Sequence, residues 1–297
     1  MNNRPRISFF CLILAVTLAV FGPSGYGQAT LKTGDPLPFG PAEELIYEAE
    51  FTRALLRKVD VAEFRFTAAR KLSSQPQTTP EFNSEIGPTY SLILTGDVES
   101  KGFFPRLFNL RFRQQVESTV EPKSFTVLRT TRVDEQGKRV RQSEAIFDKE
   151  AGKVVWTERD PNNPSREPRT EMSEFSGQVQ DILSAIYFVR TLPLRVGKTF
   201  EISVSDSGQV YTLPLRVVEK ERIKTVLGRV DTLRVDPELF GPDRMIPHQG
   251  EFSVWFTSDR RRIPVKAKLK SKYGTFDIKL KTAVQSPALV EYLTRQE

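Results

Sequence analysis

The sequence predicts a mainly β protein: a large curled antiparallel sheet or open barrel, with one main helix (about residues 181–191) packed against it and a short C-terminal helix. Three observations predict this fold class. Apolar and polar residues alternate with a period of two along most of the 297 residues, polar turns with glycine separate the alternating runs, and helical periodicity occurs in only two places. Because one helix cannot cover both faces of so many strands, the sheet is expected to curl around it or close on itself.

The first predicted strands form an antiparallel pair. Alternation runs through residues 45–51 and resumes through residues 59–68, where a change of parity near Ala62 predicts a β-bulge. Two further strands are expected over residues 90–94 and 108–120.

Two hairpins and a proline-rich loop follow. The hairpin turns are expected at residues 134–137 and 148–152, because each is a polar, glycine-containing stretch between strand-like runs. Residues 160–168 contain three prolines, which cannot donate to a ladder, so this stretch is a loop. Neither half of the chain has a self-sufficient pattern, and we therefore expect the loop to connect two parts of one sheet.

The main helix is predicted to begin after Asp181, its N-cap, and to end at Pro193. Its apolar stripe consists of Ile182, Ala185, Ile186 and Val189. The later strands are expected over residues 200–204, 211–218, 223–227, 230–235, 252–256, 263–269 and 276–280. The short closing helix would start at Ser286-Pro287.

The N-terminus has the pattern of a secretory signal peptide. Arg4 and Arg6 precede an apolar run over residues 9–20, and Gly27-Gln28-Ala29 provides a small-x-small cleavage site. The run is too short to span a hydrocarbon core of about 30 Å, although an uncleaved membrane anchor is the alternative. The sequence thus predicts a signal peptide over residues 1–29, cut after Ala29, and a single β-rich domain over residues 30–297 with no integral membrane span.

The predicted mature chain has no cysteine, because Cys11 is removed with the signal peptide. This excludes disulfides, thiolate nucleophiles and sulfur metal sites from the mature protein. An exported protein without disulfides fits the bacterial periplasm better than a eukaryotic extracellular space. We therefore expect a periplasmic or secreted protein, with a formal charge that falls from +7 to +5 when Arg4 and Arg6 are removed.

The sequence assigns no catalytic, cofactor-binding or metal-binding residue. His248 is the only histidine, and no Gly-x-Ser-x-Gly turn, phosphate loop or calcium loop accompanies it in the mature chain. We expect no cofactor and no enzyme activity. The least excluded enzyme is a hydrolase with paired carboxylates, such as Glu48 with Glu50 or Asp236 with Glu238.

The alternating aromatic residues have two interpretations. The chain contains 21 Phe, and these side chains form either a filled core or the wall of an apolar cleft. For Trp156 and Trp255, the preferred interpretation is likewise that they anchor the core, and the alternative is that they lie at the lip of a cleft.

A cationic stripe is the remaining candidate site. Lysines alternate with apolar residues at positions 266, 268, 270, 279 and 281, next to three consecutive arginines. The stripe either attracts an anionic ligand or partner, or is a solvated sheet face whose edge lysines prevent strand addition. Nucleic acid is not expected as a partner, because no aromatic platforms interleave with the stripe. The candidate contact residues are Arg260, Arg261, Arg262, Lys266, Lys268 and Lys270.

Two segments resemble the signature blocks of a known family. A Gln-Asp-x-x-Ser helix leads into a Leu-Pro-Leu segment, and a Trp-containing strand hairpin ends in Pro-Val. The matching residues are Gln180, Asp181, Ser184, Arg190, Leu192, Pro193, Leu194 and Gly197, then Trp255, Ser258, Asp259, Arg262, Pro264 and Val265; Glu44, Leu45 and Tyr47 match an N-terminal strand. On these residues the chain resembles the exported bacterial family catalogued as domain of unknown function 3108, over a core of residues 41–282.

The chain departs from the family pattern at residues 55–58 and at Arg260, which replaces a usual Asp. The resemblance implies an antiparallel β fold in the envelope, similar to the open half-barrels of lipoprotein carriers, and no established activity. It implies structural roles for the signature residues.

The sequence leaves two main functional hypotheses. In the first, the protein is a non-catalytic binding or carrier module, whose curled sheet holds the apolar part of an envelope amphiphile while an anionic head faces the cationic residues. In the second, it is a structural envelope protein with a fully packed core and a charged face that docks a partner. The expected partners are envelope lipid, a lipoprotein or an acidic polymer.

Overall fold

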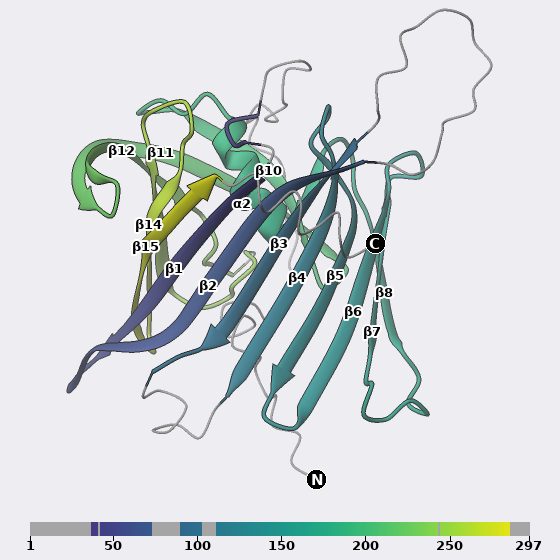
Figure 1. The fold of residues 1–297 in the computed structure, drawn as a ribbon. Coiled ribbons are helices and arrows are strands. Elements are labelled where there is room, and N and C mark those ends of the chain that lie inside the picture. The colour runs from purple at the N-terminus through teal and green to yellow at the C-terminus, as the bar shows by residue number, and fades with distance from the viewer. Residues whose placement is uncertain (1–36, 41, 73–89, 103–110, 243, 286–297) are drawn as a thin grey trace, which may run out of the picture.

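The computed structural model describes residues 37–40, 42–72, 90–102, 111–242 and 244–285. Within these residues, 15 strands form one sheet and one helix packs against it, so the predicted fold class is confirmed. The sheet is large and open rather than a closed barrel (Figure 1). The predicted signal peptide and the short helix expected after Ser286 lie outside the described residues.

The first half of the chain is an antiparallel meander in which each strand pairs with the next. It consists of β1 (Ala42–Arg53), β2 (Leu56–Leu72), β3 (Tyr90–Ser100), β4 (Phe112–Glu121), β5 (Thr126–Gln136), β6 (Arg139–Asp148), β7 (Lys153–Arg159) and β8 (Arg169–Glu174). Both predicted hairpins are confirmed, and the proline-rich loop connects the neighbouring strands β7 and β8.

The second half begins with the helix and continues the same sheet. It consists of β9 (Val179–Asp181), α2 (Ile182–Thr191), β10 (Thr199–Asp206), β11 (Gln209–Thr225), β12 (Gly228–Pro237), β13 (Gly250–Thr257), β14 (Pro264–Ser271) and β15 (Gly274–Gln285). Pairing of β1 with β15 joins the two halves, so β8 and β9 are the edges of the sheet. The sheet is mixed because β9 runs parallel to β10.

Two local details test the predicted strands. The β1–β2 register shifts between the pairs Ala49↔Ala62 and Glu50↔Asp60, which confirms the bulge predicted near Ala62. The prediction of separate strands over 211–218 and 223–227 was wrong, because β11 is continuous through 17 residues. A register shift between Val217 and Glu219 changes the parity of the pattern, while backbone pairing with β12 continues through the polar stretch.

Each edge of the curled sheet packs against the other half of the sheet without forming a strand ladder: β9 lies against β5, and the turn between β10 and β11 lies against β8. Side chains bridge this seam: the Thr130 hydroxyl donates to Asp181 Oδ2 at 2.5 Å, and Arg132 Nη2 lies 2.9 Å from Asp206 Oδ1. At the turn between β10 and β11, a Cβ added to Gly208 would lie 2.6 Å from Cβ of Glu171. The seam is therefore held by side chains and by one turn packed against β8.

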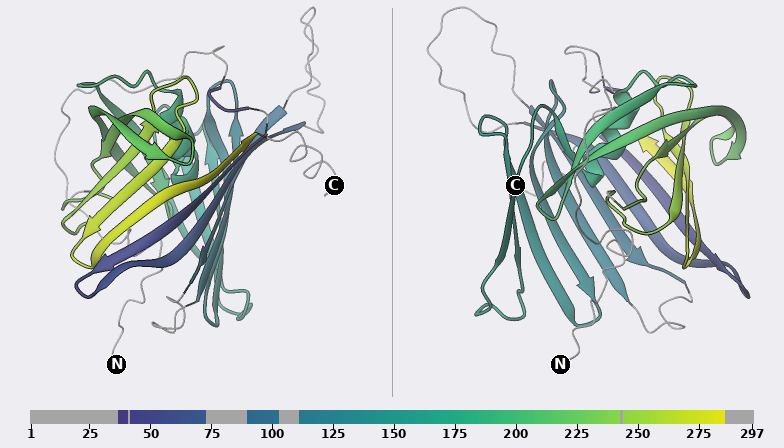
Figure 2. Two further views of the ribbon diagram at one scale, coloured as in Figure 1. Left: turned by 60° about the vertical axis from the view of Figure 1, so that its left-hand side comes forward. Right: turned by 180° about the vertical axis from the view of Figure 1, so that it is seen from behind.

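Helix α2 lies on the concave side of the sheet (Figure 2). Asp181 is its N-cap, as predicted, and forms a capping box with Ser184. Leu183, Tyr187 and Phe188 are buried in the main core cluster. The helix therefore supplies the centre around which the strands curl.

Candidate ligand-binding site

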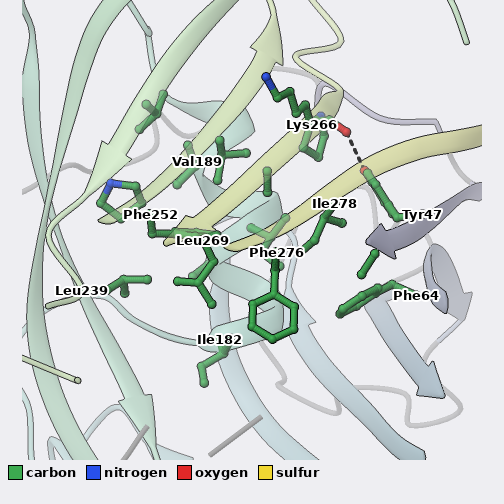
Figure 3. A pocket seen from close by; sticks show the side chains of 18 of the residues that line it. Tyr47, Phe64, Ile182, Val189, Leu239, Phe252, Lys266, Leu269, Phe276 and Ile278 are labelled. Carbon is green, nitrogen blue, oxygen red and sulfur yellow. Dashed lines mark hydrogen bonds between the residues drawn. The ribbon is translucent and has the colours of Figure 1, made fainter. Parts of the chain in front are cut away.

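An apolar pocket of about 280 Å³ lies between α2 and the concave face of the sheet (Figure 3). The predicted helix stripe forms one wall, since Ile182, Ala185, Ile186 and Val189 all line the pocket. The other side of the helix packs into the core. A helix that is apolar on both sides is expected to lie inside a protein, with neither side facing solvent. Here one side packs into the core and the other faces the pocket.

The opposite wall comes from strands that are far apart in the sequence. Phe64 on β2, Leu269 on β14 and Phe276 on β15 point into the space (Figure 3). Among the described lining residues, few polar groups are present, and the Tyr47 hydroxyl already donates to the Pro264 carbonyl at 2.7 Å. The pocket suits an apolar group rather than a polar one.

The lengths of the elements explain why the pocket is not filled. With 10 residues, α2 is about 15 Å long, whereas the 12 residues of β1 span roughly 40 Å. The helix thus covers less than half of the strands that curl around it. The main core cluster surrounds the helix, a second cluster that includes Ala49, Ala62 and Phe112 lies further along β1–β4, and residues of both clusters line the pocket between them.

A polar groove of about 730 Å³ adjoins this pocket. Pro237, Leu239, Phe240, Phe252 and Lys266 line both spaces. The groove contains five cationic and three acidic side chains: Arg216, Arg234, Lys266, Lys268 and Lys270, with Asp236, Glu238 and Glu251. An apolar cavity and a cation-rich surface are therefore contiguous.

The structure divides the predicted cationic stripe. Lys266, Lys268 and Lys270 line the groove, whereas none of the three arginines does. Arg260 is exposed, Arg261 pairs with Asp259 at 2.8 Å, and Arg262 Nη1 donates to the Arg190 carbonyl at 2.8 Å. The arginines thus belong to the β13–β14 turn and its contact with the end of α2.

Most of the predicted lysine stripe is paired with acids across neighbouring strands. Lys270 lies 2.7 Å from Glu251, Lys279 lies 2.8 Å from Glu50, and Lys281 lies 2.7 Å from Glu48. Hydrogen bonds from Lys281 and Lys101 lower the pKa of Glu48. These pairs place Glu48 and Glu50 in ion pairs on the sheet surface.

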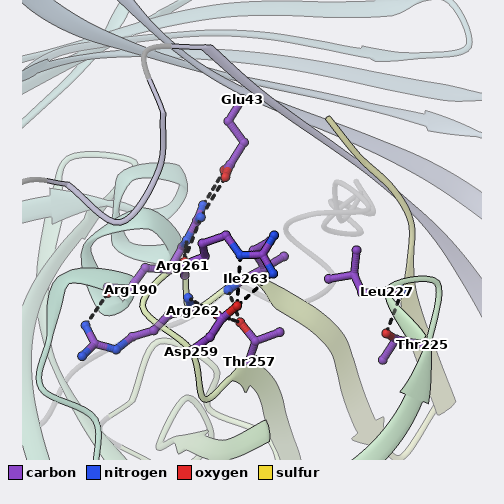
Figure 4. Close-up of polar contacts among 9 residues, drawn as sticks. All are labelled: Glu43, Arg190, Thr225, Leu227, Thr257, Asp259, Arg261, Arg262 and Ile263. Carbon is purple, nitrogen blue, oxygen red and sulfur yellow. Dashed lines mark hydrogen bonds and ion pairs between the residues drawn. The ribbon is translucent and has the colours of Figure 1, made fainter. Parts of the chain in front are cut away.

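A buried ion pair anchors the helix to the sheet (Figure 4). Arg190 is fully buried, and its guanidinium donates to both Glu43 carboxylate oxygens at 2.5 and 2.9 Å. Burial alone would lower the pKa of Arg190, but the ion pair with Glu43 outweighs burial and raises it. Arg190 also donates to the Arg261 carbonyl, so one side chain joins β1, α2 and the β13–β14 turn.

The other signature residues make structural contacts, mostly to residues outside the two signature segments. Gln180 Nε2 donates to the Phe125 carbonyl at 2.7 Å, and Trp255 Nε1 donates to Glu221 at 2.7 Å. Asp259 accepts from Thr257, which fixes the β13–β14 turn. Pro193 follows the C-cap Leu192, and Gly197 has a φ of 82°. Sequence reasoning missed Glu43, because 147 residues separate it from Arg190.

The other chemical candidates do not line the apolar pocket, although Asp236 and Glu238 line the adjoining groove. His248 is exposed in the loop before β13. Asp236 lies 3.3 Å from Arg234, and Glu238 lies 2.7 Å from Arg244. In the part of the chain that the structure describes, no cluster of acids, histidines or cysteines has the make-up of a metal site. No helix among those residues has the length and apolarity needed to cross a membrane.

Comparison with known proteins identifies a family and finds a similar solved structure. Residues 66–281 match the model of a family described as "protein of unknown function (DUF3108)". Among solved structures, the chain is similar to a β-barrel-like protein of domain of unknown function DUF1849 from Brucella abortus, with 10% identity and a TM-score of 0.47 over 83% of this chain and 98% of that chain. The curated proteins contain no match to the chain.

Proposed function

Since the chain belongs to the DUF3108 family, whose description assigns no activity, we propose a function from its own pocket: it is a non-catalytic binding or carrier module for an envelope amphiphile. The observation that supports this proposal most strongly is an apolar cavity that adjoins a cation-rich groove. An amphiphile needs both surfaces, one for its chain and one for its head.

The size and lining of the cavity support a small ligand. Small-molecule pockets measure roughly 300–1,000 Å³ and are mostly apolar with a few placed polar groups. The volume of about 280 Å³ lies just below the lower end of this range. It therefore fits a single apolar chain better than a lipid with several chains.

We also propose that the protein acts in the periplasm or outside the cell, after removal of residues 1–29. The apolar run and cleavage site in the sequence support this location. Fractionation of cells that express the full-length sequence, with N-terminal sequencing of the product, tests it. We expect a periplasmic or secreted product that begins at Thr30; an intact cytosolic product would overturn the proposal.

Mass spectrometry of the native protein, purified without detergent, tests the carrier function. We expect one bound amphiphile, identified after solvent extraction. Ile186→Trp should abolish this binding, because a larger side chain on α2 would project into the space that the apolar chain needs. Ile146→Trp is the matched control, since Ile146 is 53% exposed on β6, away from the pocket, and this variant should retain the ligand.

Two outcomes would count against the carrier. The first is a wild-type protein that has no bound amphiphile and takes up none when incubated with decanoate. The second is equal binding by the wild-type protein and by Ile186→Trp. The first result would favour the alternative function, a structural envelope protein whose charged face docks a partner, and the second would show that the amphiphile binds outside the pocket.

A further inference from the structure

Resting on the proposed function, we infer where the ligand crosses the sheet and what holds its head. The chain of the ligand passes between β12 and β13 into the pocket, and its anionic head, a carboxylate or a phosphate, lies in the outer groove against Lys266. The ligand class is therefore a single-chain amphiphile with one anionic head group.

The first argument is that β12 and β13 separate beside the pocket. Their described ladder has only four pairs, from Thr232↔Thr257 to Val235↔Val254. Beyond it, β12 pairs only with β11, up to Pro237↔Leu215, and β13 pairs only with β14, up to Gly250↔Ser271. The hydrogen-bonded ladder of the sheet is thus interrupted where the two strands part, and the Phe240 ring packs against Gly250 at this point.

Apolar side chains surround this interruption. Leu239, Phe240 and Phe252 line the inner pocket and also the outer groove. Leu239 and Phe252 are seen beside the pocket in Figure 3. A continuous apolar lining from one space to the other is what the chain of an amphiphile requires to pass through the sheet.

The second argument is the distribution of charge in the groove. Lys270 is paired with Glu251 at 2.7 Å, Arg216 with Glu238 at 3.3 Å, and Lys268 lies 3.9 Å from Asp277. Arg234 pairs with Glu219 at 2.5 Å and with Asp236 at 3.3 Å. Four of the five groove cations therefore already have carboxylate partners.

Lys266 differs from these four cations. Within the described residues no carboxylate pairs with it, and its Nζ lies 4.1 Å from the centre of the Trp255 ring. That ring is itself fixed by the hydrogen bond to Glu221. A cation that lies on an aromatic ring and has no acidic partner is available to bind an anion. Lys266 also lines both the apolar pocket and the polar groove.

Isothermal titration calorimetry on protein expressed from the full-length sequence tests the inference. The probes are decanoate, decyl phosphate and the uncharged decanol, and the variants are Lys266→Gln and Lys270→Gln. We expect Lys266→Gln to weaken binding of an anionic probe about tenfold, because it removes a charge-assisted contact, and to leave decanol binding unchanged. Lys270→Gln is the matched control on the same face of β14 and should change each affinity less than twofold.

The outcomes separate this inference from the proposed function. A loss confined to decanoate or to decyl phosphate supports the inference and identifies the head as carboxylate or phosphate. If all probes bind and Lys266→Gln behaves like the wild-type protein, the head-group site is overturned while the carrier function stands. If no probe binds to the wild-type protein, the carrier function itself fails.

Discussion

At the scale of single residues, the most consequential contact is the ion pair between Glu43 and Arg190, whose side chains are almost fully buried. The sequence identified Arg190 as a signature residue but provided no partner for it. Its partner Glu43 lies on β1, whereas Arg190 lies on α2, far along the sequence. Only the folded sheet brings the two residues together. Glu43 lies on the same buried face of β1 as Leu45 and Tyr47, and an acid on this apolar face was the one local sign of its role.

Removing one member of this pair should strongly destabilise the fold. Arg190→Met leaves the Glu43 charge buried without a partner, which costs about 3–5 kcal/mol of unfolding free energy. Urea denaturation measures this loss. The control is Arg129→Met, which breaks the exposed pair with Glu144 and should cost less than about 1 kcal/mol. Equal losses in the two variants would show that the buried pair does not anchor the helix.

Two buried tyrosines next to this pair predict sensitivity to alkaline pH. Burial raises the pKa of both Tyr47 and Tyr187; Glu43 also raises it, and Arg190 opposes the shift. An unfolded tyrosine ionises near pH 10. Because the folded state holds these protons more tightly, the stability they contribute is present below about pH 10 and is lost as the pH rises above it.

The variant Tyr187→Phe isolates this effect. Among the described residues the Tyr187 hydroxyl has no hydrogen-bond partner, so its removal should cost little at pH 7. Above about pH 10, the unfolding free energy of the variant should fall less steeply than that of the wild-type protein. Tyr273→Phe, in the β14–β15 turn, serves as the control. Parallel pH curves for the wild-type protein and Tyr187→Phe would contradict the assignment.

At the scale of elements, local sequence signals performed well and long-range ones did not. The N-cap of α2, both hairpin turns and the bulge near Ala62 follow from a few neighbouring residues, and all were predicted. The continuous β11 was missed, since polar residues 219–222 break the alternation but not the backbone pairing. The seam between the two halves of the sheet was also missed, because side chains distant in sequence form it.

Alanine substitutions at two glycines test the contact between the β10–β11 turn and β8. Gly208 and Gly228 both have positive φ values, 82° and 89°, so alanine strains the backbone at each. Only at Gly208 would the new Cβ meet another strand, because nothing lies within 4 Å at Gly228. Gly208→Ala should therefore lower the melting temperature more than Gly228→Ala does. Equal effects would show that the β10–β11 turn does not pack against β8.

At the scale of the whole molecule, the alternating pattern predicted a curled sheet around one helix, but not whether its interior is filled. Phenylalanines at alternate positions look the same in a packed core and in the wall of a cavity. Whether the interior is filled depends on the length of the helix relative to the length of the strands around it. This comparison requires knowing that β1 pairs with β15, since that pairing makes the two halves one sheet. The same non-local pairing placed acids opposite most of the lysines and left Lys266 apart.

The central claim is that the curled sheet leaves an apolar space that a ligand occupies. The heat-capacity change on binding of decanoate, obtained by calorimetry at several temperatures, tests it most directly, because burial of apolar surface makes this quantity negative. We predict a clearly negative value with one site per chain for the wild-type protein, and no binding by Ile186→Trp. A value near zero, or the same negative value in both proteins, would contradict the claim.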